Sequence, residues 1–306
     1  MKDRQDLDSE LVCGFNVSTN RKKLWASELD MLDSFEKICK ENNINYFLLF
    51  GSAIGAVRHK GFIPWDDDID IGMLREDFEK FLKCDKKDFG SNIDIQYGYN
   101  KVTGGDILLR IRDRRTTGII SDELFLDKNK GIFIEIYPFD YVDNNRMRKF
   151  QIIISTFLVR IICDRKPQNK ASVFRRLWHG VCSFMPKKSL WKFYEFICKL
   201  QNGKERKYVD TITIPDYAKT GNHLFKVEDV KKTVYVDFEY TKARIPEGYH
   251  SVLTTRYGDY MKIPEVEEQG QHHNMIVFYD PNHPYSYYDK SEIPQKYFSG
   301  EISPLI

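Results

Sequence analysis

The clearest alternation of polar and apolar residues is a short run in which Asp68 and Asp70 alternate with two isoleucines. Successive side chains of an extended strand point to opposite faces, so the aspartates share one face and the isoleucines point into a core. Residues 45–50, apolar from 46 onward, predict an earlier strand, which runs into a Gly-Ser turn at 51–52 and a short helix at 53–60. The local order is therefore strand, turn, short helix and a strand that carries paired aspartates.

Hydrophobic periodicity elsewhere predicts a mixed sheet that carries helices. Apolar residues at helical spacing between 24 and 39 predict a long helix, with Asn20 or Ser27 as its cap. A strand at 131–137 is expected to stop at Pro138. The other predicted elements are a helix at 75–83, strands at 93–97, 107–113, 117–121 and 234–238, and helices at 150–163, 173–185, 190–200 and 253–261.

The paired aspartates favour a metal site. Two carboxylates side by side repel each other, and burying even one without a partner is unfavourable. A hard divalent cation, Mg2+ with Mn2+ as the alternative, takes oxygen ligands and keeps room for phosphate oxygens. A solvated loop is the ordinary reading of an aspartate run, but the flanking strand, turn and helix favour the metal site.

Residues 51–71 closely resemble the characteristic segment of the LicD family, in the nucleotidyltransferase superfamily. That family includes bacterial phosphocholine transferases and, more distantly, fukutin-related ribitol-phosphate transferases. The resemblance implies an α+β fold with a nucleotidyltransferase-like mixed β-sheet, flanked by helices and carrying a basic helical insertion. Three later segments fit the same family in order, at residues 111–113, 131–140 and 257–261.

The chain divides by sequence pattern, composition and charge into four segments. They are a flexible N-terminal segment (1–20), a nucleotidyltransferase-like catalytic core (21–143), a basic aromatic helical insertion (144–229), and the C-terminal part of the catalytic unit with its tail (230–306). Between Asn144 and Lys207 there are 16 Lys and Arg against 3 Asp and Glu, a net charge of +13, whereas the other residues carry a net charge of −11. A basic, aromatic surface at 146–207 could contact an anionic membrane or an anionic polysaccharide, or it could be an ordinary solvated face.

Glu135 is the best candidate for a third carboxylate. It is the one acid in an otherwise apolar strand, where a charge is unfavourable unless it has a partner. The resemblance implies a third acidic residue on a later strand beside Asp68 and Asp70, so the three acids are the expected catalytic and metal-binding set. Glu135 could ligate the metal, act as general base towards an acceptor hydroxyl, or be a buried structural ion-pair partner.

Several other residues are candidates for holding the donor. Gly51 and Ser52 offer backbone N–H groups, a hydroxyl and a helix N-terminus suited to phosphate. Candidate phosphate and pocket residues are Arg58, His59, Lys60, Trp65 and Arg112. Each also has a structural alternative, as an ion-pair partner, a hydrogen-bonded side chain or part of the core. His272 and His273 are weaker candidates to approach the site.

Composition indicates a soluble globular chain, with 42% hydrophobic and 30% charged residues. The six cysteines form no Cys-x-x-Cys pair, which argues against a disulfide framework and a structural zinc site. The first residues lack the apolar core of a signal peptide. We therefore expect a cytoplasmic protein, peripheral on the inner face of the cell membrane if the basic segment contacts lipid. No recognised nucleic-acid-binding module is present, so no nucleic acid partner is expected.

The resemblance implies a transferase that moves a phosphate-substituted alcohol from a CDP-linked donor to a sugar hydroxyl. Phosphocholine from CDP-choline is the leading case, with CMP released and a surface glycan, such as lipopolysaccharide, teichoic acid or capsule, as the saccharide or lipid-linked acceptor. One alternative is a nucleotidyltransferase that releases pyrophosphate. The other is a non-catalytic glycan-binding protein, against which the intact Asp68, Asp70 and Glu135 argue.

Overall fold

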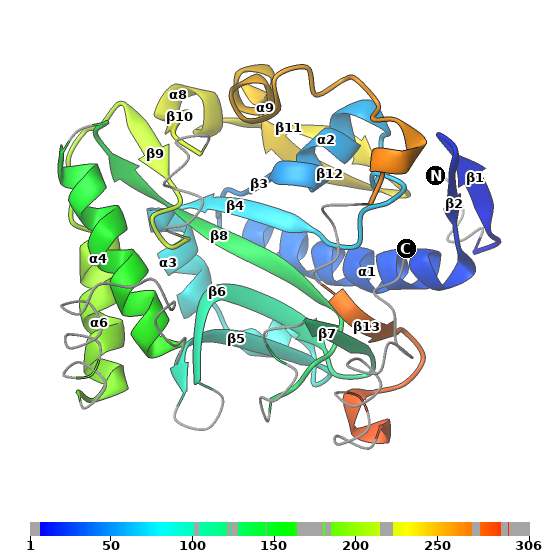
Figure 1. The fold of residues 1–306 in the computed structure, drawn as a ribbon, viewed down its shortest axis with the longest axis horizontal. Coiled ribbons are helices and arrows are strands. Elements are labelled where there is room, and N and C mark those ends of the chain that lie inside the picture. The colour runs from blue at the N-terminus through cyan, green and yellow to red at the C-terminus, as the bar shows by residue number, and fades with distance from the viewer. Residues whose placement is uncertain are drawn as a thin grey trace.

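The structure is a computed structural model, which describes residues 7–100, 104–120, 123, 128–144, 146–163, 180, 185–214, 223–270, 276–288 and 293. A seven-stranded mixed sheet lies at the centre of this described part (Figure 1). Its strands are β3 (Phe47–Leu48), β4 (Asp70–Leu74), β5 (Ile93–Asn100), β6 (Gly104–Asp113), β8 (Phe133–Val142), β9 (Tyr208–Asp210) and β10 (Phe225–Lys226).

Strand β8 connects the sheet. It pairs in parallel with β4 and antiparallel with both β6 and β9. Strand β3 extends the sheet beyond β4, β5 extends it beyond β6, and β10 extends it beyond β9. The predicted α+β class and mixed sheet are therefore confirmed.

The predicted stop at Pro138 is wrong, because β8 continues through this residue to Val142. Proline lacks the N–H that a strand uses to bond a neighbour, so it fits only where no neighbour needs that bond. The pairing of β8 with β6 ends at Ile136, and its pairing with β9 begins at Asp140. Pro138 lies in the gap between these two ladders and keeps only its place beside β4.

Two helices, α1 (Thr19–Glu41) and α3 (Arg75–Lys83), pack against the sheet and lie behind it in Figure 1. The expected caps of the first helix are wrong, because the hydroxyl of Ser18 accepts the N–H of Arg21 at 3.2 Å. This bond satisfies one of the free amides at the helix start. The helix therefore begins at Thr19.

The short helix α2 (Phe50–Arg58) follows β3 directly and lies above β4 in Figure 1. Residues 10–17, expected to be loosely ordered, form a hairpin instead. The strand pairs outside the central sheet are β1 (Glu10–Val12) with β2 (Phe15–Val17), β7 (Thr117–Ile120) with β13 (Ile276–Asp280), and β11 (Thr233–Phe238) with β12 (Thr241–Pro246). Helices α8 (Val227–Val230) and α9 (Tyr249–Tyr257) flank the last pair, and α9 starts and ends four residues before the predicted helix.

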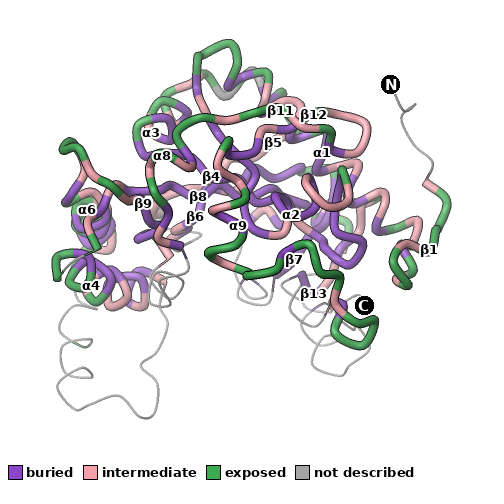
Figure 2. Tube along the Cα trace, turned by 90° about the horizontal axis from the view of Figure 1, so that it is seen from above, coloured by how far each residue is buried: buried purple, intermediate pink, exposed green. Residues whose placement is uncertain are grey.

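Helices α4 (Arg146–Ile162) and α6 (Lys187–Cys198) pack on each other and form a second apolar core at one end of the sheet (Figures 1 and 2). The ring of Trp191 meets that of Tyr97 on β5, with 5.5 Å between ring centroids. Most of the helix predicted at 173–185 lies outside the described residues. Across the described chain, no helix has both the length and the apolar character that crossing a membrane requires.

Candidate active site

Three neighbouring strands bring two acids and an arginine into one row. Asp70 of β4 pairs in register with Glu135 of β8, which pairs in turn with Arg110 of β6. Residues directly opposite each other in a sheet point to the same face. Arg110 Nε donates to Glu135 Oε1 at 2.6 Å, and the hydroxyl of Tyr137 donates to Glu135 Oε2 at 2.7 Å. Both oxygens of the buried Glu135 carboxylate are thus held in place.

The start of α2 holds the aspartate segment from the other side. Ser52 Oγ accepts the N–H of Asp70 at 2.8 Å and donates to the carbonyl of Asp68 at 3.4 Å. A Cβ on Gly51 would lie well below 3.0 Å from a carboxylate oxygen of Asp66, a separation that real Cβ atoms essentially never show. Glycine and serine are therefore needed here to seat the aspartates, in addition to any role towards phosphate.

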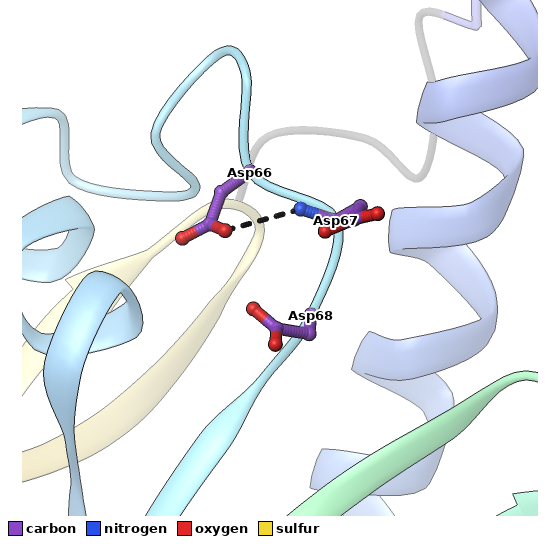
Figure 3. A group of neighbouring side chains, drawn as sticks. All are labelled: Asp66, Asp67 and Asp68. Carbon is purple, nitrogen blue, oxygen red and sulfur yellow. Dashed lines mark hydrogen bonds between the residues drawn. The ribbon is translucent and has the colours of Figure 1, made fainter. Parts of the chain in front are cut away.

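Asp66, Asp67 and Asp68 gather their carboxylates ahead of β4 (Figure 3). One oxygen from each lies within 4.8 Å of the others, and the N–H of Asp67 donates to Asp66 Oδ1 at 3.2 Å. Loss of hydration, followed by the charges of Asp70 and Asp66, raises the pKa of Asp68 well above its ordinary value. Carboxylates packed this closely resist ionisation on their own, whereas a bound divalent cation would stabilise their ionised form.

Sequence comparisons identify relatives of this chain. The family described as LicD/FKTN/FKRP, nucleotidyltransferase domain, matches residues 43–157. The lipopolysaccharide cholinephosphotransferase LicD of Haemophilus influenzae is 30% identical over 261 residues, which cover 80% of this chain and 92% of that protein. The chain belongs to the LicD family. An uncharacterised protein of Rickettsia typhi is 53% identical over 38% of this chain and 35% of its own length, and the mouse ribitol 5-phosphate transferase FKRP is 29% identical over 35% of this chain and 19% of its own.

In this LicD-family chain, Arg112 is committed to internal contacts. It is fully buried, with its guanidinium 4.5 Å from the centroid of the Phe133 ring. Nη2 donates to Glu123 at 2.7 Å and Nε to Gln96 at 3.0 Å, while Nη1 donates to two backbone carbonyls. These bonds correspond to the structural alternative for Arg112. The arginine that contacts the acidic row is Arg110, which the sequence analysis did not single out.

Arg58 and His59, two of the basic candidates, are hydrogen-bonded to each other, and Arg58 also binds the segment after α9. Arg58 Nη1 donates to the carbonyls of Tyr260 and Lys262, at 2.9 and 3.0 Å, and Arg58 Nε donates to His59 at 2.9 Å. Burial and the charge of Arg58 lower the pKa of His59 to about 4, so this imidazole is neutral at pH 7.

Two further candidates are placed differently. Lys60 is exposed, with φ of +58°, and its carbonyl accepts the N–H of Glu239. Trp65 is buried in the core. His272 and His273 lie outside the described residues.

Helix α9 contributes two residues that the sequence analysis missed. Loss of hydration at its hydroxyl, followed by the charges of Asp70 and Asp66, raises the pKa of Tyr257 to about 12, and 39% of the surface of this residue stays exposed. The guanidinium of the preceding Arg256 lies 4.5 Å from the centroid of the Phe50 ring, at the start of α2. The family segment at 257–261 pointed to this region, but Arg256 precedes it.

The side chain of Arg256 contacts a buried histidine. His223 and Arg256 are hydrogen-bonded, and burial followed by the charge of Arg256 lowers the pKa of His223 to about 3. The imidazole is therefore neutral at ordinary pH and accepts a hydrogen bond from the guanidinium. This hydrogen bond helps to hold the positively charged guanidinium of Arg256 at the start of α2.

Polar side chains of helix α1 contact the aspartate segment. Arg21 Nη1 and Trp25 Nε1 both donate to the carbonyl of Asp66, at 2.8 and 3.0 Å. Glu28 lies on the same helical face, since these three positions follow the spacing of successive turns. Burial and then the charges of Asp67 and Asp66 raise the pKa of Glu28 well above its ordinary value. The amphipathic pattern predicted this helix, but it did not indicate that polar groups on its buried face meet the aspartates.

Proposed function

We propose that this protein transfers phosphocholine from CDP-choline to a sugar hydroxyl of a cell-surface glycan and releases CMP. The observation that carries the proposal is the row of Asp70, Glu135 and Arg110 beside the carboxylates of Asp66, Asp67 and Asp68 at the start of α2. Phosphoryl transfer needs neutralised oxygens and an aligned nucleophile more than covalent help from the protein. The names of the Haemophilus cholinephosphotransferase and the mouse ribitol 5-phosphate transferase support a phosphorylated alcohol as the transferred group.

The residues present fit a hard divalent cation. The donor set consists of carboxylate oxygens, which Mg2+ and Mn2+ prefer. In this proposal Asp68 and Asp70 hold Mg2+, and Glu135 supplies a third oxygen through a lone pair that Arg110 and Tyr137 leave available. Bound there, the cation would neutralise charge on the diphosphate and on the departing CMP.

The chain's own groups bind and orient the donor. The first-turn amides of α2 lack partners within their helix and suit a phosphate oxygen. Arg256, which packs on Phe50 at that helix start, adds a positive charge on the same side. Ser52 fixes the backbone of Asp68 and Asp70, so the carboxylates keep their spacing when the donor binds.

The acceptor side involves the helical pair α4 and α6. Large apolar side chains are exposed there beside Lys149 and Lys192, and Ile153 and Phe196 have 65% and 57% of their surface accessible. Apolar side chains among basic ones suit the headgroup region of an anionic membrane. We propose that this face contacts the membrane that carries a lipid-linked acceptor.

The test is CMP release by the purified protein with Mg2+, offered CDP-choline, CDP-ethanolamine, CDP-ribitol and CDP-glycerol in turn, with a crude glycan acceptor. The D68N/D70N variant is the negative control, and D237N, which removes an exposed carboxylate on β11, is the matched control. Metal-dependent CMP from CDP-choline in wild type and D237N, and its absence in D68N/D70N, is the expected result. Pyrophosphate release from a nucleoside triphosphate, with no CMP from any CDP-alcohol, would overturn the proposal in favour of a nucleotidyltransferase.

A further inference from the structure

Glu123 is a buried acid that the proposed reaction does not use. It lies between β7 and β8 with 2% of its surface exposed. Its Oε1 accepts from Arg110 Nη1 at 2.9 Å and lies 2.5 Å from Lys128 Nζ, while its Oε2 accepts from Arg112 Nη2 at 2.7 Å. Burial alone would raise the pKa of this carboxyl, but the charges of the three cations, led by Arg112, lower it. The carboxylate is therefore ionised at neutral pH.

Arg110 joins Glu123 to the acidic row of the candidate site. Its Nε donates to Glu135 Oε1 at 2.6 Å, and its Nη1 donates to Glu123. Its guanidinium also lies 5.5 Å from the centroid of the Phe133 ring, on the strand that carries Glu135. A guanidinium is planar and its N–H groups have a fixed geometry, so a bond to one nitrogen constrains the direction of the others. Glu123 therefore helps to set how Arg110 meets Glu135.

Six charged side chains form this network, and their charges cancel. The cations are Arg110, Arg112 and Lys128, and the anions are Glu123, Glu135 and Asp106. Asp106 lies 2.6 Å from Lys128 but 3.8 Å from Arg110, which is beyond hydrogen-bond distance. Without the Glu123 carboxylate, Glu135 would be the one acid among the described residues within hydrogen-bond distance of Arg110.

The bond to Glu123 limits how far Arg110 occupies the oxygens of Glu135. Because Nη1 is engaged by Glu123, the guanidinium reaches Glu135 through Nε, at Oε1, while Oε2 accepts from the hydroxyl of Tyr137. Each carboxylate oxygen has two lone-pair sites, so Glu135 retains acceptor capacity for a metal ion. An Arg110 released from Glu123 can turn to bind Glu135 through two nitrogens, the geometry that arginine favours with a carboxylate. That capacity would then be reduced.

We propose that Glu123 is a positioning residue, which acts through Arg110 to keep Glu135 available as a metal ligand. This inference rests on the proposed function, because that function assigns Glu135 to a divalent cation together with Asp68 and Asp70. It does not depend on which alcohol is transferred. The contribution of Glu123 should therefore appear in metal affinity, and it should require Arg110.

The test is Mn2+ binding to the full-length, chelator-treated protein, measured by titration calorimetry. Loss of a group that orients a metal ligand typically weakens metal binding about 10–100-fold. Because Glu123 acts through one intermediate side chain, E123Q should weaken Mn2+ binding by about tenfold, the lower end of that range. D106N is the matched control, because it removes the same charge from the same network without removing a hydrogen bond to Arg110. It should bind Mn2+ nearly as tightly as wild type.

A double-mutant cycle tests the route through Arg110. R110K keeps the positive charge but lacks the planar fork that contacts Glu135 and Glu123 together. In the R110K background, E123Q should therefore weaken Mn2+ binding no further, because the two substitutions interrupt the same connection. Losses that simply multiply would mean that Glu123 acts independently of Arg110, and they would overturn the proposal.

Thermal unfolding of the metal-free proteins separates positioning from a general loss of structure. E123Q and D106N both break buried ion pairs and should both lower Tm, but only E123Q should also weaken Mn2+ binding. If E123Q does not fold, E123D takes its place, because it keeps the charge while its shorter side chain cannot retain its bonds to both arginines without a backbone shift.

Three results would overturn the proposal: wild-type Mn2+ affinity in the Glu123 variant, equal weakening by D106N, or no Mn2+ binding by wild type. A separate result tests the proposed function. If the Mn2+ affinities follow the expected pattern but wild type releases no CMP from any CDP-alcohol, the proposed transfer fails and the role of Glu123 in metal binding stands.

Discussion

Replacing Gly51 with alanine probes how closely α2 and the aspartate segment must approach. The new Cβ would lie 3.3 Å from Asp66 Cγ and far inside van der Waals contact with one of its oxygens. The carbonyl of Asp66 is fixed by Arg21 and Trp25, so the backbone cannot simply retreat. The carboxylate must rotate, and its hydrogen bond from the N–H of Asp67 at 3.2 Å is then strained or lost.

The magnitude follows from two opposing effects. Overpacking a buried site destabilises by about 1–3 kcal/mol. Alanine in place of glycine at a conformation it tolerates stabilises by about 0.4–1 kcal/mol. We therefore expect G51A to lose about 1–2 kcal/mol of unfolding free energy, a fall of a few degrees in Tm. We also expect weaker Mn2+ binding, because the displaced carboxylate belongs to the cluster.

Thermal unfolding and Mn2+ titration measure the two effects. The control is G180A, at an exposed helical glycine where an added Cβ meets nothing within 4 Å, and it should leave both unchanged or slightly raise Tm. If G51A matched G180A in Tm and in Mn2+ affinity, the close approach of α2 to Asp66 would not be a constraint and the reasoning would fail.

Three further perturbations have defined outcomes. S52A leaves the buried N–H of Asp70 without its acceptor, so it should lower the free energy of unfolding by about 1–3 kcal/mol in chemical denaturation and should weaken Mn2+ binding. Unchanged values would show that the Ser52 hydroxyl does not hold the backbone of the aspartate segment in place. His223 has a folded pKa of about 3 against 6.5, so the unfolded chain takes up the proton first and stability falls as pH drops below 6.5. At pH 5 this loss is about 2 kcal/mol relative to pH 7, and H223Q should flatten that part of the pH–stability curve; an equally steep curve in H223Q would exclude this origin. F196S should reduce sedimentation with anionic vesicles, whereas V234S, on an exposed position of β11, should not; equal sedimentation of both would contradict membrane contact by α6.

The sequence predicted much of the scaffold because its signals are local. The helix predicted at 75–83 matches α3 (Arg75–Lys83), and Asp70 begins the buried strand β4, whereas Asp68, predicted on the same strand, precedes it. Strand β8 was located from its apolar run, but its end was missed, because the tolerance for Pro138 depends on where two other strands stop pairing. Ladder boundaries of this kind depend on partners far apart in the chain.

The site was only partly predictable for the same reason. Arg110 and Arg112 share one face of β6, so alternation alone cannot tell which of them meets an acid of β8. Register decides, and it sets Arg110 opposite Glu135 and Arg112 opposite Phe133. Glu28 was missed because the helical pattern identifies a buried face without indicating which distant loop packs on it.

The most direct test of the proposed transfer is the mass of the glycan product formed with CDP-choline and Mg2+. The acceptor should gain phosphocholine, with one CMP released for each group transferred and no product from D68N/D70N. An acceptor that instead gained a nucleoside monophosphate, with pyrophosphate released from a nucleoside triphosphate, would contradict the account.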